Sequence, residues 1–143
     1  MDNVNFGYCL WLLCDKDEEL EKIADGFEAH MSILTDLNLT EAFDLYECLE
    51  KNPSLVVEVD QYKSISYDNG FNTIYFKVKY DEDNERKKPN WWPDNAHISV
   101  KYKYNEDFTD GEKRIKIFDK KCKMKGIKLM RCTGHHKDWR WIM

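Results

Sequence analysis

The sequence predicts an α+β fold in which two lobes face each other across a central cleft. Hydrophobic patterns along the 143 residues follow the order β-α-β-α-β-β-β-α-β-β, which is typical of that class. A five-residue pattern also occurs twice, as Ala29-His30-Met31-Ser32-Ile33 and as Ala96-His97-Ile98-Ser99-Val100. Each copy lies on a predicted strand, and the two strands fall at comparable positions in the two halves of the chain. We therefore expect residues 1–143 to form one domain whose lobes are related by an approximate two-fold axis.

The first half of the chain begins with a continuous apolar run, Phe6 to Cys14, which predicts a strand buried on both faces. Asp15 and Glu18 resemble a capping box, which predicts a short helix beyond them with the apolar positions Leu20, Ile23, Ala24 and Phe27. The first histidine strand follows and continues to Leu34.

A second helix is predicted after a second capping-box pattern, Asn38 with Glu41. Its expected buried face consists of Leu39, Ala42, Leu45, Tyr46 and Leu49. Pro53 is expected to stop the helix, because proline cannot continue the hydrogen-bond pattern.

Strands and one further helix are predicted in the remainder. Leu55–Asp60 and Lys63–Tyr67 read as strands, and Asp68-Asn69-Gly70 is a turn that leads into a returning strand, Thr73–Tyr80. The region 81–90 is polar and reads as a loop. The region 111–125 suits either a helix or a strand, and we favour a helix ended by Gly126. The regions 127–132 and 139–142 are the last predicted strands.

The duplicated His-x-Ser pattern supplies the candidate catalytic groups. Side chains alternate along a strand, so His30 and Ser32 share one face while the apolar residues between and after them share the other. The same holds for His97 and Ser99. Two imidazoles can act as general base and general acid at neutral pH, and hydroxyls can donate hydrogen bonds to developing negative charge. Together these groups would hydrolyse a phosphodiester without a metal ion.

Three segments resemble the two-histidine phosphoesterases, and within them the short cyclic phosphodiesterases of plants and yeast. Tyr8–Leu13 with the later segment 27–33 is similar to their first strand and first motif, although Ala29 stands where that family has proline. His97–Tyr102 is similar to their second motif, and Ile127–Trp139 to their closing strand, turn and tryptophan. The resemblance implies two pseudo-symmetric antiparallel sheets with outer helices and a central cleft.

The resemblance also implies a function. The expected reaction is the opening of 2′,3′-cyclic or 1″,2″-cyclic phosphates, or the cutting of 2′-linked phosphodiesters, with no metal and no cofactor. His30 and His97 would be catalytic, and Ser32, Ser99 and Tyr102 would bind the substrate. Viral relatives degrade 2′,5′-oligoadenylates or cyclic dinucleotides, and that use stays open. A non-catalytic module that binds RNA ends or nucleotides is the other alternative.

Composition narrows the setting and the partners. Five cysteines at irregular spacing favour free thiols in a reducing compartment, so we expect a cytoplasmic protein. We also expect a monomer. The longest apolar run, Tyr8–Cys14, is too short to span a membrane. Residues 1–110 contain 11 Lys and Arg against 24 Asp and Glu, whereas residues 111–143 contain 11 against 3. That basic segment either holds the phosphates of a nucleotide or short oligonucleotide, or is a solvated face.

Other residue groups have competing interpretations. Cys132 with His135 and His136, with or without Cys122, could suggest zinc, but the spacing fits no common zinc pattern and a polar turn is the better interpretation. The pair Trp91–Trp92 could stack on a base or cover the core. Trp11 and the aromatic residues of the 73–80 strand are expected in the core.

Overall fold

The computed structural model describes residues 4–15, 18–24, 26–51, 55–81, 87–118 and 120–143. It is an α+β structure dominated by antiparallel strands, and the order of strands and helices agrees with the predicted order. The elements are β1 (Asn5–Cys14), α1 (Glu18–Ile23), β2 (His30–Leu37), α2 (Leu39–Cys48), β3 (Leu55–Asp68), β4 (Phe71–Tyr80), β5 (His97–Tyr104), α3 (Asp110–Lys113), β6 (Lys120–Thr133), the 3-10 turn η1 (His136–Asp138) and β7 (Arg140–Trp141).

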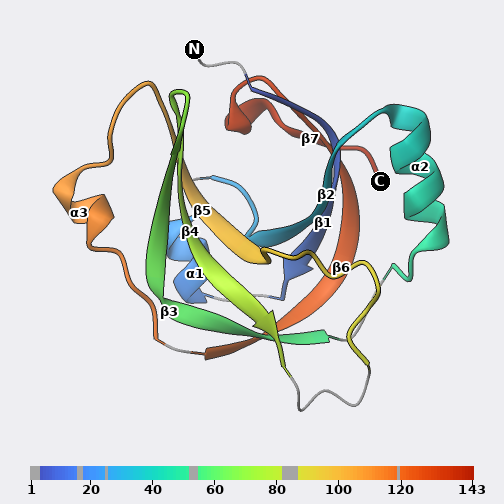
Figure 1. Ribbon diagram of the computed structural model, residues 1–143, viewed down its shortest axis with the longest axis horizontal. Coiled ribbons are helices and arrows are strands. Elements are labelled where there is room, and N and C mark those ends of the chain that lie inside the picture. Colours follow the sequence, from blue (N-terminus) through green and yellow to red (C-terminus); the bar gives the residue numbers. More distant parts are fainter. Residues whose placement is uncertain (1–3, 16–17, 25, 52–54, 82–86, 119) are drawn as a thin grey trace.

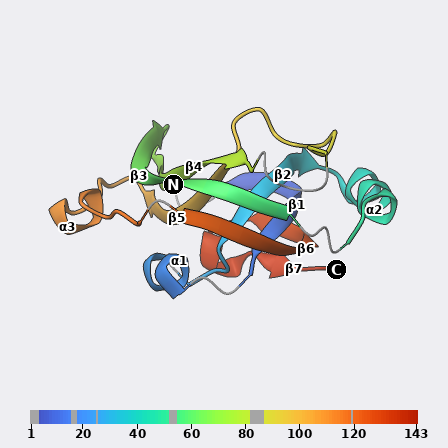
Figure 2. The same ribbon diagram turned by 90° about the horizontal axis from the view of Figure 1, so that it is seen from below.

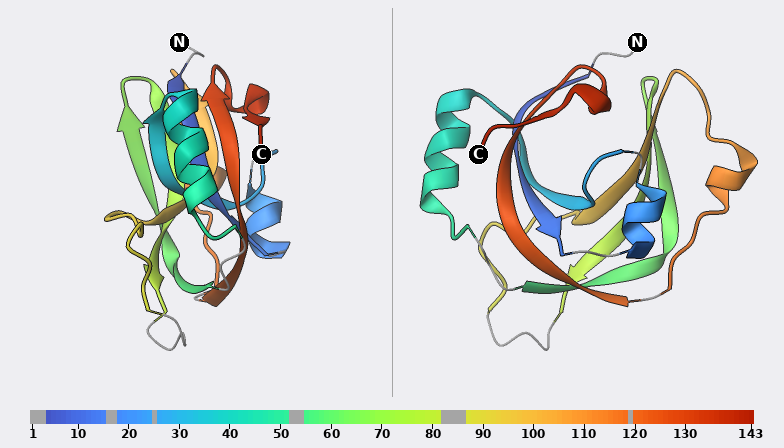
Figure 3. Two further views of the ribbon diagram at one scale, coloured as in Figure 1. Left: turned by 90° about the vertical axis from the view of Figure 1, so that its right-hand side faces the viewer. Right: turned by 180° about the vertical axis from the view of Figure 1, so that it is seen from behind.

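All seven strands belong to one sheet rather than to two. The strand order is β1-β2-β5-β4-β3-β6-β7, and β1 also pairs with β6, so the first six strands close into a ring (Figure 1). The ring closes because β6 is long: its start, Lys120–Met124, pairs with β3, and the remainder, Met124–Thr133, pairs with β1. The view from behind in Figure 3 follows the same path of strands.

The ring is joined most weakly between β2 and β5. Among the described residues, this junction contains a single pair in register, Met31 with Ile98. These two residues are the central positions of the two Ala-His-x-Ser copies. The duplicated segments therefore cross at their midpoints.

The hairpin at Asp68-Asn69-Gly70 is confirmed. Asp68 pairs with Phe71, and the two turn residues have positive φ angles, 48° at Asn69 and 88° at Gly70, as a type I′ turn requires. The segments Leu55–Asp60 and Lys63–Tyr67 belong to one strand, β3, as the predicted order requires, with a register shift between Val59 and Lys63.

Helix α2 confirms its predicted start but not its predicted burial. The Asn38 side chain accepts a hydrogen bond from the Glu41 amide, and the Glu41 carboxylate accepts one from the Asn38 amide. Of the expected buried face only Ala42 is buried, whereas Leu39 and Leu45 are exposed. The reason is that α2 lies on the outside of the sheet against β1 and β6, as the left view of Figure 3 shows. The predicted stop at residue 53 lies outside the described residues.

The first helix, α1, begins at Glu18, and Leu20 is its fully buried residue. The predicted cap at Asp15 precedes residues that lie outside the described part of the chain. Figure 2 shows α2 and α3 at opposite ends of the molecule, with the strands between them.

The helix favoured over residues 111–125 is wrong. Only α3, which ends at Lys113, is helical, and from Lys120 onward the chain is strand β6. Within β6, Cys122 and Met124 are buried while Lys121, Lys123 and Lys125 on either side of them are exposed, which is the two-residue period of a strand. Phe118, counted for the helical pattern, is 82% exposed.

The central strand β1 separates two hydrophobic clusters. Leu10 and Leu12 face the main core, whereas Cys9, Trp11 and Leu13 face a smaller cluster on the other side. The strand is therefore buried on both faces, as predicted. All five cysteines are free thiols. No helix among the described residues is long and apolar enough to cross a bilayer.

The α2 cap can be tested by substitution. Asn38→Ala removes the acceptor for the Glu41 amide, so we expect a loss of about 1 kcal/mol in the free energy of unfolding, measured by urea denaturation. Asn38→Ser keeps an acceptor and is expected to lose much less. Equal losses in the two variants would contradict the capping role.

Candidate active site

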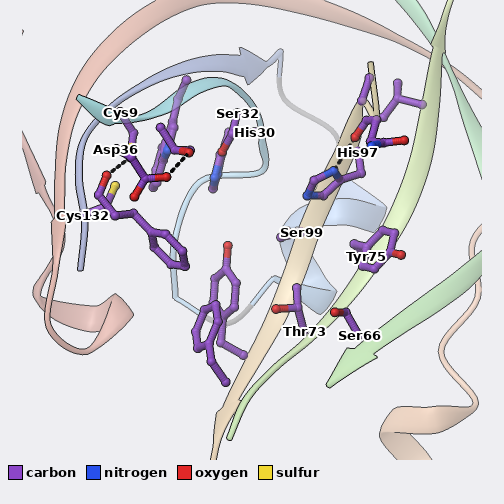
Figure 4. Close-up of a pocket in the computed structure, with 18 of the residues that line it drawn as sticks. Cys9, His30, Ser32, Asp36, Ser66, Thr73, Tyr75, His97, Ser99 and Cys132 are labelled. Carbon is purple, nitrogen blue, oxygen red and sulfur yellow. Dashed lines mark hydrogen bonds between the residues drawn. The ribbon is translucent and has the colours of Figure 1, made fainter. Parts of the chain in front are cut away.

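The two histidine strands border one cavity of about 700 Å³ (Figure 4). All five residues predicted to form the site line it: His30, His97, Ser32, Ser99 and Tyr102. In Figure 4, His30 and Ser32 lie on one side of the space and His97 and Ser99 on the other. A cavity of this size holds a nucleotide-sized ligand.

Strand register explains why these side chains meet. Met31 and Ile98 face the core, so the residues on either side of each of them face the opposite side of the sheet. In antiparallel register, the positions next to this pair place His30 opposite Ser99 and Ser32 opposite His97. The partners of these four residues on the adjacent strands β1 and β4 follow from the β1–β2 and β4–β5 pairings. Across the four strands this gives two rows: Leu13, His30, Ser99 and Tyr75, and Trp11, Ser32, His97 and Lys77.

Both imidazoles are held in the same way. Nδ1 of His30 lies 2.7 Å from the carbonyl oxygen of Glu28, and Nδ1 of His97 lies 2.7 Å from that of Asn95. A carbonyl oxygen only accepts, so each Nδ1 carries the hydrogen and donates it. In the neutral ring this leaves the lone pair on Nε2. Each histidine is therefore oriented by the carbonyl of the residue two positions before it.

The surroundings of the two histidines differ. His30 is 2% exposed and stacks on Trp11 with ring centroids 3.4 Å apart. The pKa of His30 is lowered to about 4, mainly by burial and also by the nearby His97, whereas the hydrogen bond to the Glu28 carbonyl and the Glu28 charge oppose the shift. His97 is half-buried, and its ring lies 5.0 Å from that of Tyr75. His30 is thus neutral at pH 7, with an unprotonated Nε2.

Hydroxyl groups complete the central part of the site. Ser99 is buried, Ser32 is half-buried, and both face the cavity. The Tyr102 side chain is hydrogen-bonded to Ser99, and its burial raises the pKa of the phenol, so the hydroxyl keeps its proton. Because the bond between Ser99 and Tyr102 uses one hydroxyl hydrogen, two hydroxyl hydrogens of this group remain to donate to oxygen atoms of a bound phosphate.

The rest of the lining was not predicted. Trp11 is buried in the smaller hydrophobic cluster, as expected, and its side chain also lines the cavity. Tyr75, expected in the core, is only half-buried and lines the cavity. The remaining polar wall comes from several elements: Thr35 and Asp36 of β2, Ser66 of β3, Thr73, Tyr75 and Lys77 of β4, and Asp94 and Asn95 before β5. An aromatic end is formed by Phe6, Phe71 and Trp139. Alternation along β4 marks Thr73, Tyr75 and Lys77 as one face, but only the pairing of β4 with β5 reveals that this face is the cavity wall.

The basic segment does not reach the cavity. None of the described lysines and arginines of residues 111–143 lines it. Several instead pair with acidic residues of the body: Lys120 with Glu19, Lys121 with Asp81 at 3.3 Å, and Lys125 and Lys128 with Glu28 at 3.6 and 2.6 Å. The prediction that this segment holds substrate phosphates is therefore wrong for this cavity.

The other competing groups also lie elsewhere. Trp91 and Trp92 pack against the main core, and Trp92 meets the Tyr80 ring edge to face at 5.4 Å, so the core interpretation holds. The His136 ring stacks on that of Tyr104, and the His135 ring lies tilted against Tyr104 with centroids 4.5 Å apart. Over the described ranges, no three His, Cys, Asp or Glu side chains form a group able to hold a metal ion.

Comparison with known proteins gives no assignment: no protein-family model, no curated protein and no solved structure matches this chain. The function must therefore be inferred from the cavity itself. Its centre offers two oriented imidazoles and three hydroxyls, which can move protons and hold an anion.

The lowered pKa of His30 predicts a pH-dependent stability. An exposed histidine in the unfolded chain takes up a proton near pH 6.5, whereas folded His30 does so near pH 4, so stability falls as the pH falls through this window. Between about pH 7.5 and about pH 5 this difference corresponds to a loss of about 2 kcal/mol, measured by urea denaturation. His30→Gln is expected to remove that loss. His135 lies outside the cavity lining, so His135→Gln is expected to retain the loss of stability at low pH. An unchanged loss in His30→Gln would contradict the lowered pKa of His30 as its cause.

Proposed function

We propose that the protein is a metal-independent hydrolase of nucleotide phosphodiesters. It would open 2′,3′-cyclic or 1″,2″-cyclic phosphates, or cut 2′-linked phosphodiesters. The observation that carries this proposal is the convergence of two matched His-x-Ser pairs on one cavity, with both imidazoles held through Nδ1. This arrangement also supports the expected likeness to the two-histidine phosphoesterases.

In the proposed reaction, Nε2 of His30 removes a proton from a water molecule as the water oxygen forms a bond to phosphorus. The bond between phosphorus and the leaving oxygen breaks, and protonated His97 gives its proton to that oxygen. Burial of His30 supports its role as the base, since its low pKa keeps it neutral. The half-buried position of His97 leaves it accessible to a leaving group.

The hydroxyls of Ser32 and Ser99 would donate to the non-bridging oxygens of the phosphate. Negative charge grows on these oxygens in the transition state, so donors fixed in advance lower the barrier. Tyr102 would keep Ser99 in place by donating its hydroxyl hydrogen to the Ser99 oxygen, which leaves the Ser99 hydrogen for the phosphate.

A two-lobed arrangement of the ring is part of the proposal. One lobe would contain β1, β2 and β6, and the other β3, β4 and β5, with the approximate two-fold axis at the Met31–Ile98 pair. A rotation about this axis would exchange β2 with β5 and β1 with β4, and it would place His30 on His97. It would also place Trp11, the partner of Ser32, on Tyr75, the partner of Ser99. This repeated neighbourhood supports two related lobes.

Removing either imidazole tests the proposal. We expect His30→Ala and His97→Ala each to lower kcat by at least about 10²-fold on nucleoside 2′,3′-cyclic phosphates or 2′,5′-oligoadenylate, with a smaller change in substrate affinity, because each histidine moves a proton in the rate-limiting step. His135→Ala is the matched control and is expected to keep its activity. Assays contain a chelator, since no metal is expected to take part.

Full activity in either histidine variant would contradict the acid–base pair. A wild-type protein that binds these nucleotides tightly and hydrolyses none of them would instead identify a binding module.

The pH profile should distinguish free protein from the substrate complex. In free protein His30 has a pKa of about 4, so kcat/KM is expected to hold on the acid side until about that pH. A bound phosphodiester anion favours the protonated imidazole, so the acid limb of kcat is expected at higher pH. Steady-state kinetics across the pH range measure both limbs. Coincident limbs, or loss of kcat/KM already near neutrality, would contradict His30 as the base.

A further inference from the structure

The cavity contains a cation that the proposed reaction does not use. We propose that Lys77 binds a second phosphate of the substrate, on the side of His97 that faces away from His30. This inference rests on the proposed function and narrows its substrate class to phosphodiesters whose leaving alcohol carries a further phosphate.

The position of Lys77 follows from the β4–β5 ladder. Lys77 is the direct antiparallel partner of His97, so the two side chains leave the sheet on the same face. Lys77 lines the cavity together with His97, and it is the only lysine or arginine among the described lining residues. An ammonium group therefore lies one strand beyond the imidazole that protonates the leaving oxygen.

Lys77 is also available to a ligand. It is exposed, and within the described ranges it makes no ion pair. Lys79, two residues further along the same face of β4, pairs with Glu58 and lies outside this cavity. An unpaired ammonium at the wall of a cavity attracts anionic groups of a bound molecule.

The two lobes differ at this position. The approximate two-fold axis relates Lys77 beside His97 to Leu13 beside His30, and Leu13 is buried among apolar residues. Only the His97 side therefore offers a cation. Since the serines and histidines already surround the scissile phosphate, Lys77 would meet a different phosphate, attached to the alcohol that leaves toward His97.

A pair of substrates that differ by one phosphate tests this inference. Adenosine 2′,3′-cyclic phosphate has a leaving alcohol without a further phosphate, whereas its 5′-phosphorylated form carries one on the same ribose. We expect wild-type protein to favour the 5′-phosphorylated form by at least about 5-fold in kcat/KM, and this preference to shrink with added salt. In Lys77→Gln the preference is expected to disappear while activity on the first substrate barely changes.

Two variants serve as controls. Lys77→Arg keeps the positive charge and is expected to retain the preference for the 5′-phosphorylated substrate. Lys79→Gln removes one positive charge from the same face of β4 and is expected to retain this preference as well. Urea denaturation verifies that each variant is folded. No preference in wild-type protein, or an unchanged preference in Lys77→Gln, would overturn the inference.

Failure of the proposed function gives a different result. If wild-type protein hydrolyses neither nucleotide, the hydrolase proposal fails, and the ratio of the two dissociation constants, measured by calorimetry, still tests Lys77. If wild-type protein binds the 5′-phosphorylated form more tightly and Lys77→Gln loses this difference, Lys77 binds the second phosphate and the protein is a binding module.

Discussion

The pairing of Met31 with Ile98 is the contact on which the candidate site depends. Both side chains are fully buried in the main core, and they form the one pair in register between β2 and β5 within the described part of the chain. Because neighbouring residues on a strand face opposite ways, burial of these two turns His30 and His97 toward the cavity. A slip of one residue would bury the imidazoles in the core and expose the apolar side chains. Core packing therefore fixes the direction of the chemical groups.

The parts of the fold that could be predicted are those set by neighbours in the sequence. Asn38 caps α2 through a residue three positions on, and Asn69-Gly70 forms its turn because both positions accept positive φ angles. Closure of the sheet could not be predicted, since nothing local specifies that β6 meets both β1 and β3. The region 120–125 was assigned to a helix because a few apolar residues at helical spacing outweighed the strict alternation of lysine with apolar residues.

The same distinction applies to the site. His30, His97 and their serines could be found because motif and strand period are both local. The unequal surroundings of the two histidines could not, because Trp11 reaches His30, and Tyr75 reaches His97, through strand pairing. Two copies of one pattern thereby acquire different surroundings: burial lowers the pKa of His30, whereas His97 is half-buried at the cavity wall.

Ring closure joins strands from opposite ends of the chain. Asn5 pairs with Thr133, so the contact between β1 and β6 joins residues 128 positions apart in the sequence. Contacts this distant in sequence slow folding, because the entropy of closing the loop is lost before the contact stabilises anything. During synthesis, the apolar edge of β1 stays without its partner until residues 120–133 emerge from the ribosome. The lysine-rich strand β6 is therefore the segment that finally shields the most hydrophobic stretch of the nascent chain from aggregation.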